Sequence, residues 1–158
     1  MAVFSLTLVS CGNDEEDDPT LTYELINING KNYACYGYGM PITYQSLWKD
    51  GTLHISLPLG ELADAQKGEY DYDYMIGITC SDGSKPSVGT NLANYPNIEA
   101  TIILNEGGSA VYESGSAIVK SIKDDDYITI EFKDFKCKTS SIQSYTFNGT
   151  VKLDYDVD

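Results

Sequence analysis

The chain has 158 residues and a formal net charge of −14, from 24 carboxylates against ten cations, all of them lysine. Without the guanidinium fork of arginine, and with a pI near 4.2, the chain would be repelled by a nucleic-acid backbone, so we exclude nucleic-acid binding. No stretch of about 18 apolar residues occurs, and we therefore expect no transmembrane helix.

Residues 1–18 differ in composition from the rest of the chain. The apolar run over residues 2–9 ends in the small residue Ser10, as a secretory signal does. Cys11 follows, and then five consecutive carboxylates over residues 14–18, which repel one another and stay solvated and extended. We divide the chain into a partial signal peptide (1–10), an acidic tether (11–20) and one domain (21–158).

The segment Leu8-Val9-Ser10-Cys11 resembles the lipobox of bacterial lipoproteins, and the acidic stretch behind it resembles the surface-export signal of Bacteroidota lipoproteins. This resemblance ends at Asp18. It implies that Cys11 becomes the first mature residue and carries fatty acyl chains, palmitate among them. The protein is then expected to be anchored in the outer membrane and exposed at the cell surface. Small surface lipoproteins of this group with all-β domains include glycan-binding, adhesive and uncharacterised members.

Beyond the tether, apolar residues alternate with polar ones and short turns recur, which predicts strands almost throughout. Asn29-Gly30 and Asp50-Gly51 each predict a tight hairpin, because these dipeptides accept positive φ at both central positions of a type I′ turn. The strands that the two turns join are predicted over residues 22–28 with 31–38, and over residues 43–48 with 52–57.

The middle of the chain predicts a short helix followed by two strands. Residues 61–67 contain helix formers, and Gly68 is placed as a C′ cap, so we expect one or two helical turns. Residues 69–80 predict a long strand whose even positions face inward, namely Tyr70, Tyr72, Tyr74, Ile76, Ile78 and Cys80. A second strand is expected to bury Ile98, Ala100, Ile102 and Leu104 and to end in a turn at residues 106–108.

The C-terminal third predicts a hairpin and a final long strand. Residues 117–122 and 127–133 flank an acidic turn, with Ile128, Ile130 and Phe132 inward, and the apolar phase changes after Asp134 as at a β-bulge. Apolar parity then runs unbroken from residue 145 to residue 157, so Gly149 is predicted inside one strand and not at a turn.

These elements predict an all-β fold, an antiparallel β-sandwich of about nine or ten strands with one short helix. A lipocalin-like closed barrel is the alternative, because it also needs about eight antiparallel strands with long inward faces.

The residue inventory disfavours catalysis. His54 is the only histidine and lies in an alternating strand, and the chain has no nucleophile elbow, no P-loop and no dinucleotide fingerprint. No pattern of closely spaced zinc ligands and no EF-hand loop occurs, and the carboxylates at 124–126 are interpreted as a solvated hairpin tip.

Cys35, Cys80 and Cys137 are expected to be buried apolar residues, with at most one disulfide among them. We expect no enzyme activity, no cofactor and no metal.

Aromatic side chains are the best indication of binding, since 13 tyrosines and one tryptophan could stack on sugar rings. The loop over residues 81–97 is longer than most connections, which indicates either a functional loop or disorder. The candidate ligand-binding residues are Trp48, Tyr95, Asn94, Asn97, Tyr36, Tyr38 and Tyr44. The expected function is a non-catalytic surface module that binds a glycan or a protein. The alternative is a structural or assembly lipoprotein that contacts another envelope protein through a sheet edge or face.

Overall fold

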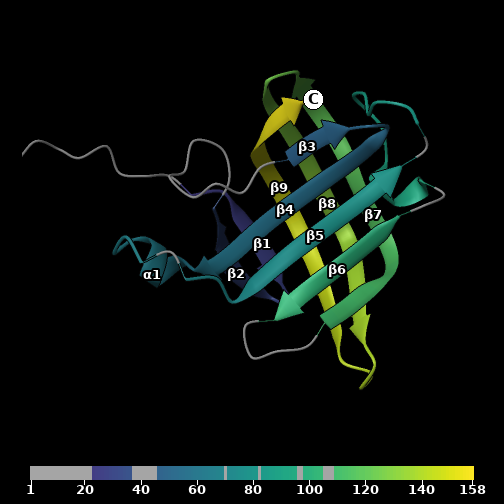
Figure 1. Ribbon diagram of the computed structural model, residues 1–158. Helices are drawn as coiled ribbons and strands as arrows, with labels where there is room; N and C mark the ends of the chain where they lie inside the picture. The colour runs from purple at the N-terminus through teal and green to yellow at the C-terminus, as the bar shows by residue number, and fades with distance from the viewer. Residues whose placement is uncertain (1–22, 37–45, 70, 82, 96–97, 105–108) are drawn as a thin grey trace, which may run out of the picture.

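The computed structural model describes residues 23–36, 46–69, 71–81, 83–95, 98–104 and 109–158, and for residues 100–104 the backbone alone (Figure 1). The described residues form nine strands, a short α-helix and a 3-10 helix, so the predicted all-β class with one short helix is confirmed. None of the described helices has the length and hydrophobicity to cross a bilayer. The elements are β1 (Leu25–Ile28), β2 (Lys31–Cys35), β3 (Ser46–Lys49), β4 (Thr52–Glu61), α1 (Leu62–Ala65), β5 (Tyr74–Ser81), η1 (Leu92–Asn94), β6 (Glu99–Leu104), β7 (Ser109–Lys123), β8 (Asp126–Thr139) and β9 (Ser144–Val157).

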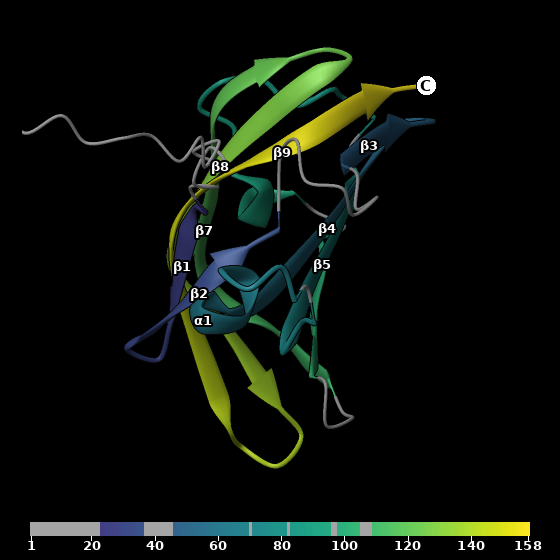
Figure 2. The ribbon, with the colours of Figure 1, turned by 90° about the vertical axis from the view of Figure 1, so that its left-hand side faces the viewer.

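The described strands belong to one sheet that closes on itself (Figures 1 and 2). Neighbours pair in the order β4-β5-β6-β7-β8-β9, and β9 returns to β4 through β3 at one end and through β1 and β2 at the other. The β3–β9 pairing is parallel, whereas the other pairings of the described strands are antiparallel. The closed-barrel alternative therefore describes the arrangement better than a sandwich of two separate sheets. Alternating strands with one buried face suit both arrangements, so strand pattern alone does not choose between them.

Both predicted hairpins are confirmed. Asn29 and Gly30 have φ values of 50° and 90°, and Asp50 and Gly51 have values of 50° and 78°, as type I′ turns require. The predicted helix is also confirmed at Leu62–Ala65, and after it the backbone N–H of Gly68 donates to the carbonyl of Ala65 over 3.0 Å.

The long strand expected over residues 69–80 is shorter in the structure, where β5 begins at Tyr74. Ile76, Ile78 and Cys80 are fully buried, so the inward even face is confirmed within the strand. Tyr72 lies before it and packs instead in a small cluster outside the barrel, between β2 and α1. Tyr70 and the turn at residues 106–108 lie outside the described residues, as do the side chains expected inward on β6 after Ile98.

The predicted bulge and the final strand are both confirmed. The β8–β9 register shifts between Phe132 and Phe135, where Asp134 has a φ of 47° and its N–H donates to Oδ1 of Asn148 over 2.8 Å. β9 runs without interruption through Gly149, whose φ is 146°. A Cβ there would lie 2.7 Å from the carbonyl oxygen of Leu25, because β1 pairs closely with β9 at this point.

The barrel interior is filled by apolar side chains from the strands, with Leu92 and Tyr95 among them. Cys35, Cys80 and Cys137 are buried and no disulfide joins them, so they pack as small apolar residues. Ile128, Ile130 and Phe132 face inward as predicted.

Candidate functional site

Residues 83–95 cross one end of the barrel and are fixed by hydrogen bonds to β7. The N–H of Gly89 donates to the carbonyl of Val119 over 2.8 Å, and the N–H of Val119 donates to the carbonyl of Thr90 over 2.9 Å. The segment thus covers the edge of β7, which β6 pairs only near its start. Of the two alternatives for the long loop, disorder therefore does not apply to residues 83–95.

Asn91 is the side chain that shapes this segment. Its Oδ1 accepts the N–H of Ala93 over 3.1 Å, which begins η1, and the N–H of Ala117 over 3.0 Å, which joins the loop to β7. Leu92 follows and is fully buried in the barrel core. Asn91 thus accepts hydrogen bonds from backbone N–H groups at the barrel end, while the side chain of Leu92 fills the end of the core.

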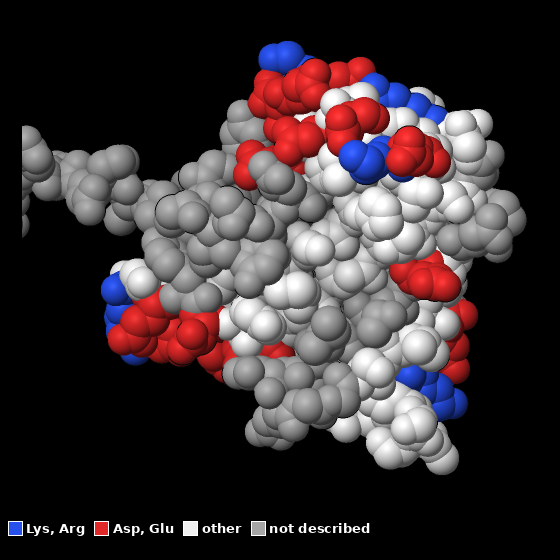
Figure 3. Space-filling view, viewed as in Figure 1, with Lys and Arg blue, Asp and Glu red and all other residues white. Residues whose placement is uncertain are grey.

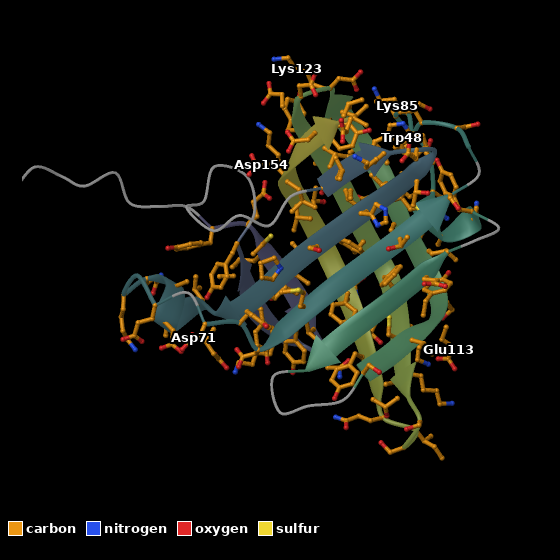
Figure 4. The ribbon with its side chains drawn as sticks, viewed as in Figure 1. Trp48, Asp71, Lys85, Glu113, Lys123 and Asp154 are labelled. Carbon is orange, nitrogen blue, oxygen red and sulfur yellow. The ribbon has the colours of Figure 1, made fainter. Side chains whose placement is uncertain are left out.

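A polar groove opens on the outer side of this segment. It has a volume of about 350 Å³ and is lined by Ser84, Lys85, Ser87, Thr90, Asn91, Asn94 and Tyr95. The lining offers hydroxyls, amides and one ammonium group, so it presents both donors and acceptors. Nζ of Lys85 lies 2.5 Å from Oδ2 of Asp124 on the β7–β8 turn, which brings that turn to the rim of the groove (Figure 4).

Two predicted site residues line this groove, and they differ in exposure. Asn94 is exposed, with its Oδ1 3.4 Å from Nδ2 of Asn91. Tyr95 is only 8% exposed, and its hydroxyl donates to the carbonyl of Ser84 over 3.5 Å. The expectation that Tyr95 is an exposed stacking aromatic is therefore wrong. Its ring packs into the core at the barrel end, an inward turn that a polar loop sequence does not reveal.

Trp48 lies at the same end of the barrel (Figure 4). It is half-buried on β3 and packs against the core. The turn after it meets the start of the loop, since a Cβ at Gly51 would lie 3.3 Å from Cα of Gly83. The structure thus brings Trp48 toward the groove, although it is not among the lining residues.

Tyr36 does not belong to this site. It is 1% exposed, its hydroxyl donates to the carbonyl of Asp71 over 3.2 Å, and burial raises its pKa to about 12. Its ring packs edge-on against Tyr23 in the cluster beside α1. The interpretation of Tyr36 as a binding aromatic is therefore wrong, because the residue closes a small second core. Tyr38, Tyr44 and Asn97 lie outside the described residues.

Carboxylates gather at the end of the barrel that carries the β7–β8 turn and the C-terminus (Figure 3). Asp124 pairs with Lys85, Oδ1 of Asp125 accepts the N–H of Val157 over 3.1 Å, and Asp126 pairs with Lys123 over 2.6 Å. Among the described residues, no cluster of acidic, histidine or cysteine side chains is arranged to hold a metal ion. His54 is exposed on β4 with Nδ1 3.4 Å from Oγ1 of Thr79.

A second groove, of about 460 Å³, lies where the start of β7 meets the end of β8. Val111 in its lining is 61% exposed, and Glu113 pairs there with Lys138. The ring of Tyr112 packs 5.1 Å from that of Phe135, and its hydroxyl donates to the carbonyl of Gly115. Sequence reasoning missed this groove, because bulges at Ser114 obscure the strand pattern of early β7.

Sequence reasoning identified the loop but not most of the groove-lining side chains within it. Ser84, Lys85, Ser87, Thr90 and Asn91 were indicated only by the length and polar composition of the loop. No protein-family model matches the sequence, and neither a curated protein nor a solved structure is significantly similar to it.

Proposed function

We propose that the protein is a non-catalytic cell-surface binding module, anchored in the outer membrane through lipid on Cys11, which binds a glycan in the groove formed by residues 83–95. The observation that carries this proposal is the lining of that groove, in which every side chain can form hydrogen bonds. Sugar hydroxyls both donate and accept, and the amide and hydroxyl groups of Asn91, Asn94 and Ser87 match that chemistry.

The rigidity of the groove supports binding. Its backbone is joined to β7 through Thr90 and Asn91, so little conformational entropy would be lost when a ligand is bound. The described residues of the lining include no carboxylate and no histidine, whereas glycoside hydrolysis uses a pair of carboxyl groups flanking the scissile bond. These features favour retention of a glycan over its cleavage.

A second candidate function is docking of another envelope protein at the opposite end of the barrel. The observation in its favour is apolar exposure there, because Val111 is 61% exposed in the second groove and Ile142, on the adjoining β8–β9 turn, is 76% exposed. Exposed apolar groups of this kind mark interaction surfaces when they occur together.

The glycan proposal is tested with a glycan array and calorimetry on the chain carrying Cys11→Ala, which keeps it free of lipid. Asn94→Ala removes an exposed amide from the groove and should weaken binding of an array hit by about 1 kcal/mol, or about fivefold. Gln143→Ala is the matched control, since it removes an exposed amide from the β8–β9 turn and should leave the affinity unchanged.

If the wild type and Asn94→Ala bind the ligand with equal affinity, the groove is not the glycan-binding site. If the array gives no hit and Val111→Asp abolishes association with a partner isolated from the outer membrane, the docking function replaces glycan binding.

The lipid anchor is tested separately in the native host. Cys11→Ala should move the protein from the membrane fraction to the soluble fraction, because each buried methylene of an acyl chain contributes about 0.8 kcal/mol to membrane binding. Mass spectrometry of the wild-type N-terminal peptide should show the acyl mass. An unmodified Cys11 together with unchanged fractionation would contradict the anchor.

A further inference from the structure

Lys85 supplies the only cation among the described residues that line the groove, and its charge is already compensated. Its ammonium group lies 2.5 Å from the carboxylate of Asp124, a residue 39 positions further along the chain. The side chains are 34% and 58% exposed, so the pair forms at the rim of the groove and not beneath it. A ligand in the groove therefore meets an ion pair in place of a free ammonium group.

The surroundings of this ion pair are acidic. Asp125 and Asp126 follow Asp124 in the same turn, and the C-terminal segment adds Asp156 and Asp158 at this end of the molecule (Figure 3). Lys123 and Lys49 each pair with one of these carboxylates, so the described cations nearby are engaged as well. The whole chain carries a net charge of −14, which at long range repels anionic ligands more than neutral ones.

We propose that the groove selects uncharged or amino-bearing oligosaccharides and rejects acidic ones, with Asp124 as the residue that sets this selectivity by neutralising Lys85. This inference rests on the proposed function, since it names the class of glycan for the same groove. A uronate beside Lys85 would find its ammonium group already paired and would lie closer to the Asp124 carboxylate than the screening distance of about 8–10 Å. A neutral sugar is not repelled by carboxylates and does not need a free cation. A protonated amino group on the sugar is attracted to the carboxylates.

The test uses matched ligands and a matched pair of variants. Each neutral oligosaccharide retained by the protein is compared with the same compound oxidised at C6 to the uronic acid. Wild-type protein should bind the oxidised form at least about tenfold more weakly at low salt, and added salt should narrow the difference. Asp124→Asn releases Lys85 to form a charge-assisted hydrogen bond, and it should raise the affinity for the oxidised form about tenfold with little change for the neutral form.

Asp71→Asn is the control, because it removes the same charge from an exposed position well away from Lys85 (Figure 4). It should leave the preference as in the wild type. Equal binding of neutral and oxidised ligands by the wild type, or no gain for Asp124→Asn, would overturn the selectivity while leaving glycan binding intact. Failure of every ligand to bind would overturn the proposed function and this inference together.

Discussion

Single residues in unusual backbone conformations mark the points where this barrel is most constrained. Gly149 at a φ of 146° lets β1 approach β9 so closely that a side chain would meet the Leu25 carbonyl. Ile142 is the opposite case, because it is β-branched, has a φ of 74° and is 76% exposed. The turn at Ile142 is held by its neighbours, whose bonds include the N–H of Gln143 donating to Oγ1 of Thr139 over 3.1 Å.

Replacing Ile142 by Asn should stabilise the protein. Asn tolerates the left-handed region, which costs other L-residues about 1–2 kcal/mol, and little apolar burial is lost at so exposed a position. We expect the free energy of unfolding to rise by about 1 kcal/mol in urea melts. Val88→Asn, at an exposed loop position whose φ is not positive, should change it by less than about 0.5 kcal/mol. A destabilised Ile142→Asn would show that the exposed side chain makes a stabilising contact.

At the scale of the residue, sequence reasoning was right where a local pattern carried the information. Gly149 was predictable because apolar parity continues on both sides of it. Tyr95 was not, since whether an aromatic in a polar loop turns toward the core depends on the space left at the barrel end. The burial of Tyr36 could not be predicted either, because it depends on packing against α1, which lies in another part of the chain.

Among the elements, β9 contributes most to the closure of the sheet. It pairs with β8 along one side, and with β1 and β3 at separate places on the other. Phe147 and Val151 are fully buried on its inward face, while Thr150 between them is exposed opposite Glu131.

Val151→Asp should therefore unfold the domain, because an unpaired charge in an apolar interior costs several kcal/mol against a total stability of about 5–15 kcal/mol. Thr150→Asp places the same charge on the outer face, where repulsion from Glu131 should cost about 0.5 kcal/mol. Thermal melts followed by circular dichroism distinguish the two variants. Equal loss of stability in both would mean that the inward and outward faces of β9 were assigned wrongly.

The elements most accessible from sequence were those with clean alternation or a diagnostic turn, such as β9 and the hairpin at Asn29-Gly30. The first part of β7 was missed, because register shifts around Ser114 break the period of two on which strand prediction relies. The closed barrel was available only as the alternative to a sandwich, since choosing between them depends on β9 meeting β1 and β3, contacts that are distant in the sequence.

The whole molecule combines a strongly acidic surface with a core rich in buried hydroxyl and thiol groups. Burial raises the pKa of Tyr36, Tyr74 and Tyr155 from 10 to about 12 and that of Cys137 from 9 to about 12. Among the described residues, the Tyr155 hydroxyl has no hydrogen-bond partner and lies in a fully buried side chain. A charged phenolate or thiolate is stabilised by water but not by the apolar core, so these groups ionise more readily in the unfolded chain than in the folded protein.

Stability should consequently fall on the alkaline side. Each of these pKa values is higher in the folded protein than in the unfolded chain, so the stability it contributes is complete below pH 9 to 10 and is lost as the pH rises to about 12. Urea melts between pH 8 and pH 12 should show this decline. Tyr155→Phe, which removes an unpaired hydroxyl, should be at least as stable as the wild type at neutral pH and should decline less steeply. An unchanged slope in this variant would contradict the role of Tyr155.

The location of the binding site is tested most directly by a ¹H–¹⁵N chemical-shift titration of the chain carrying Cys11→Ala with a neutral oligosaccharide. If the groove is the site, the shifts that saturate with ligand should cluster in residues 83–95 and at Asp124, while the amides of residues 109–113 and 138–140 stay unmoved. Shifts confined to the second groove, or saturating shifts with none in residues 83–95, would contradict the account.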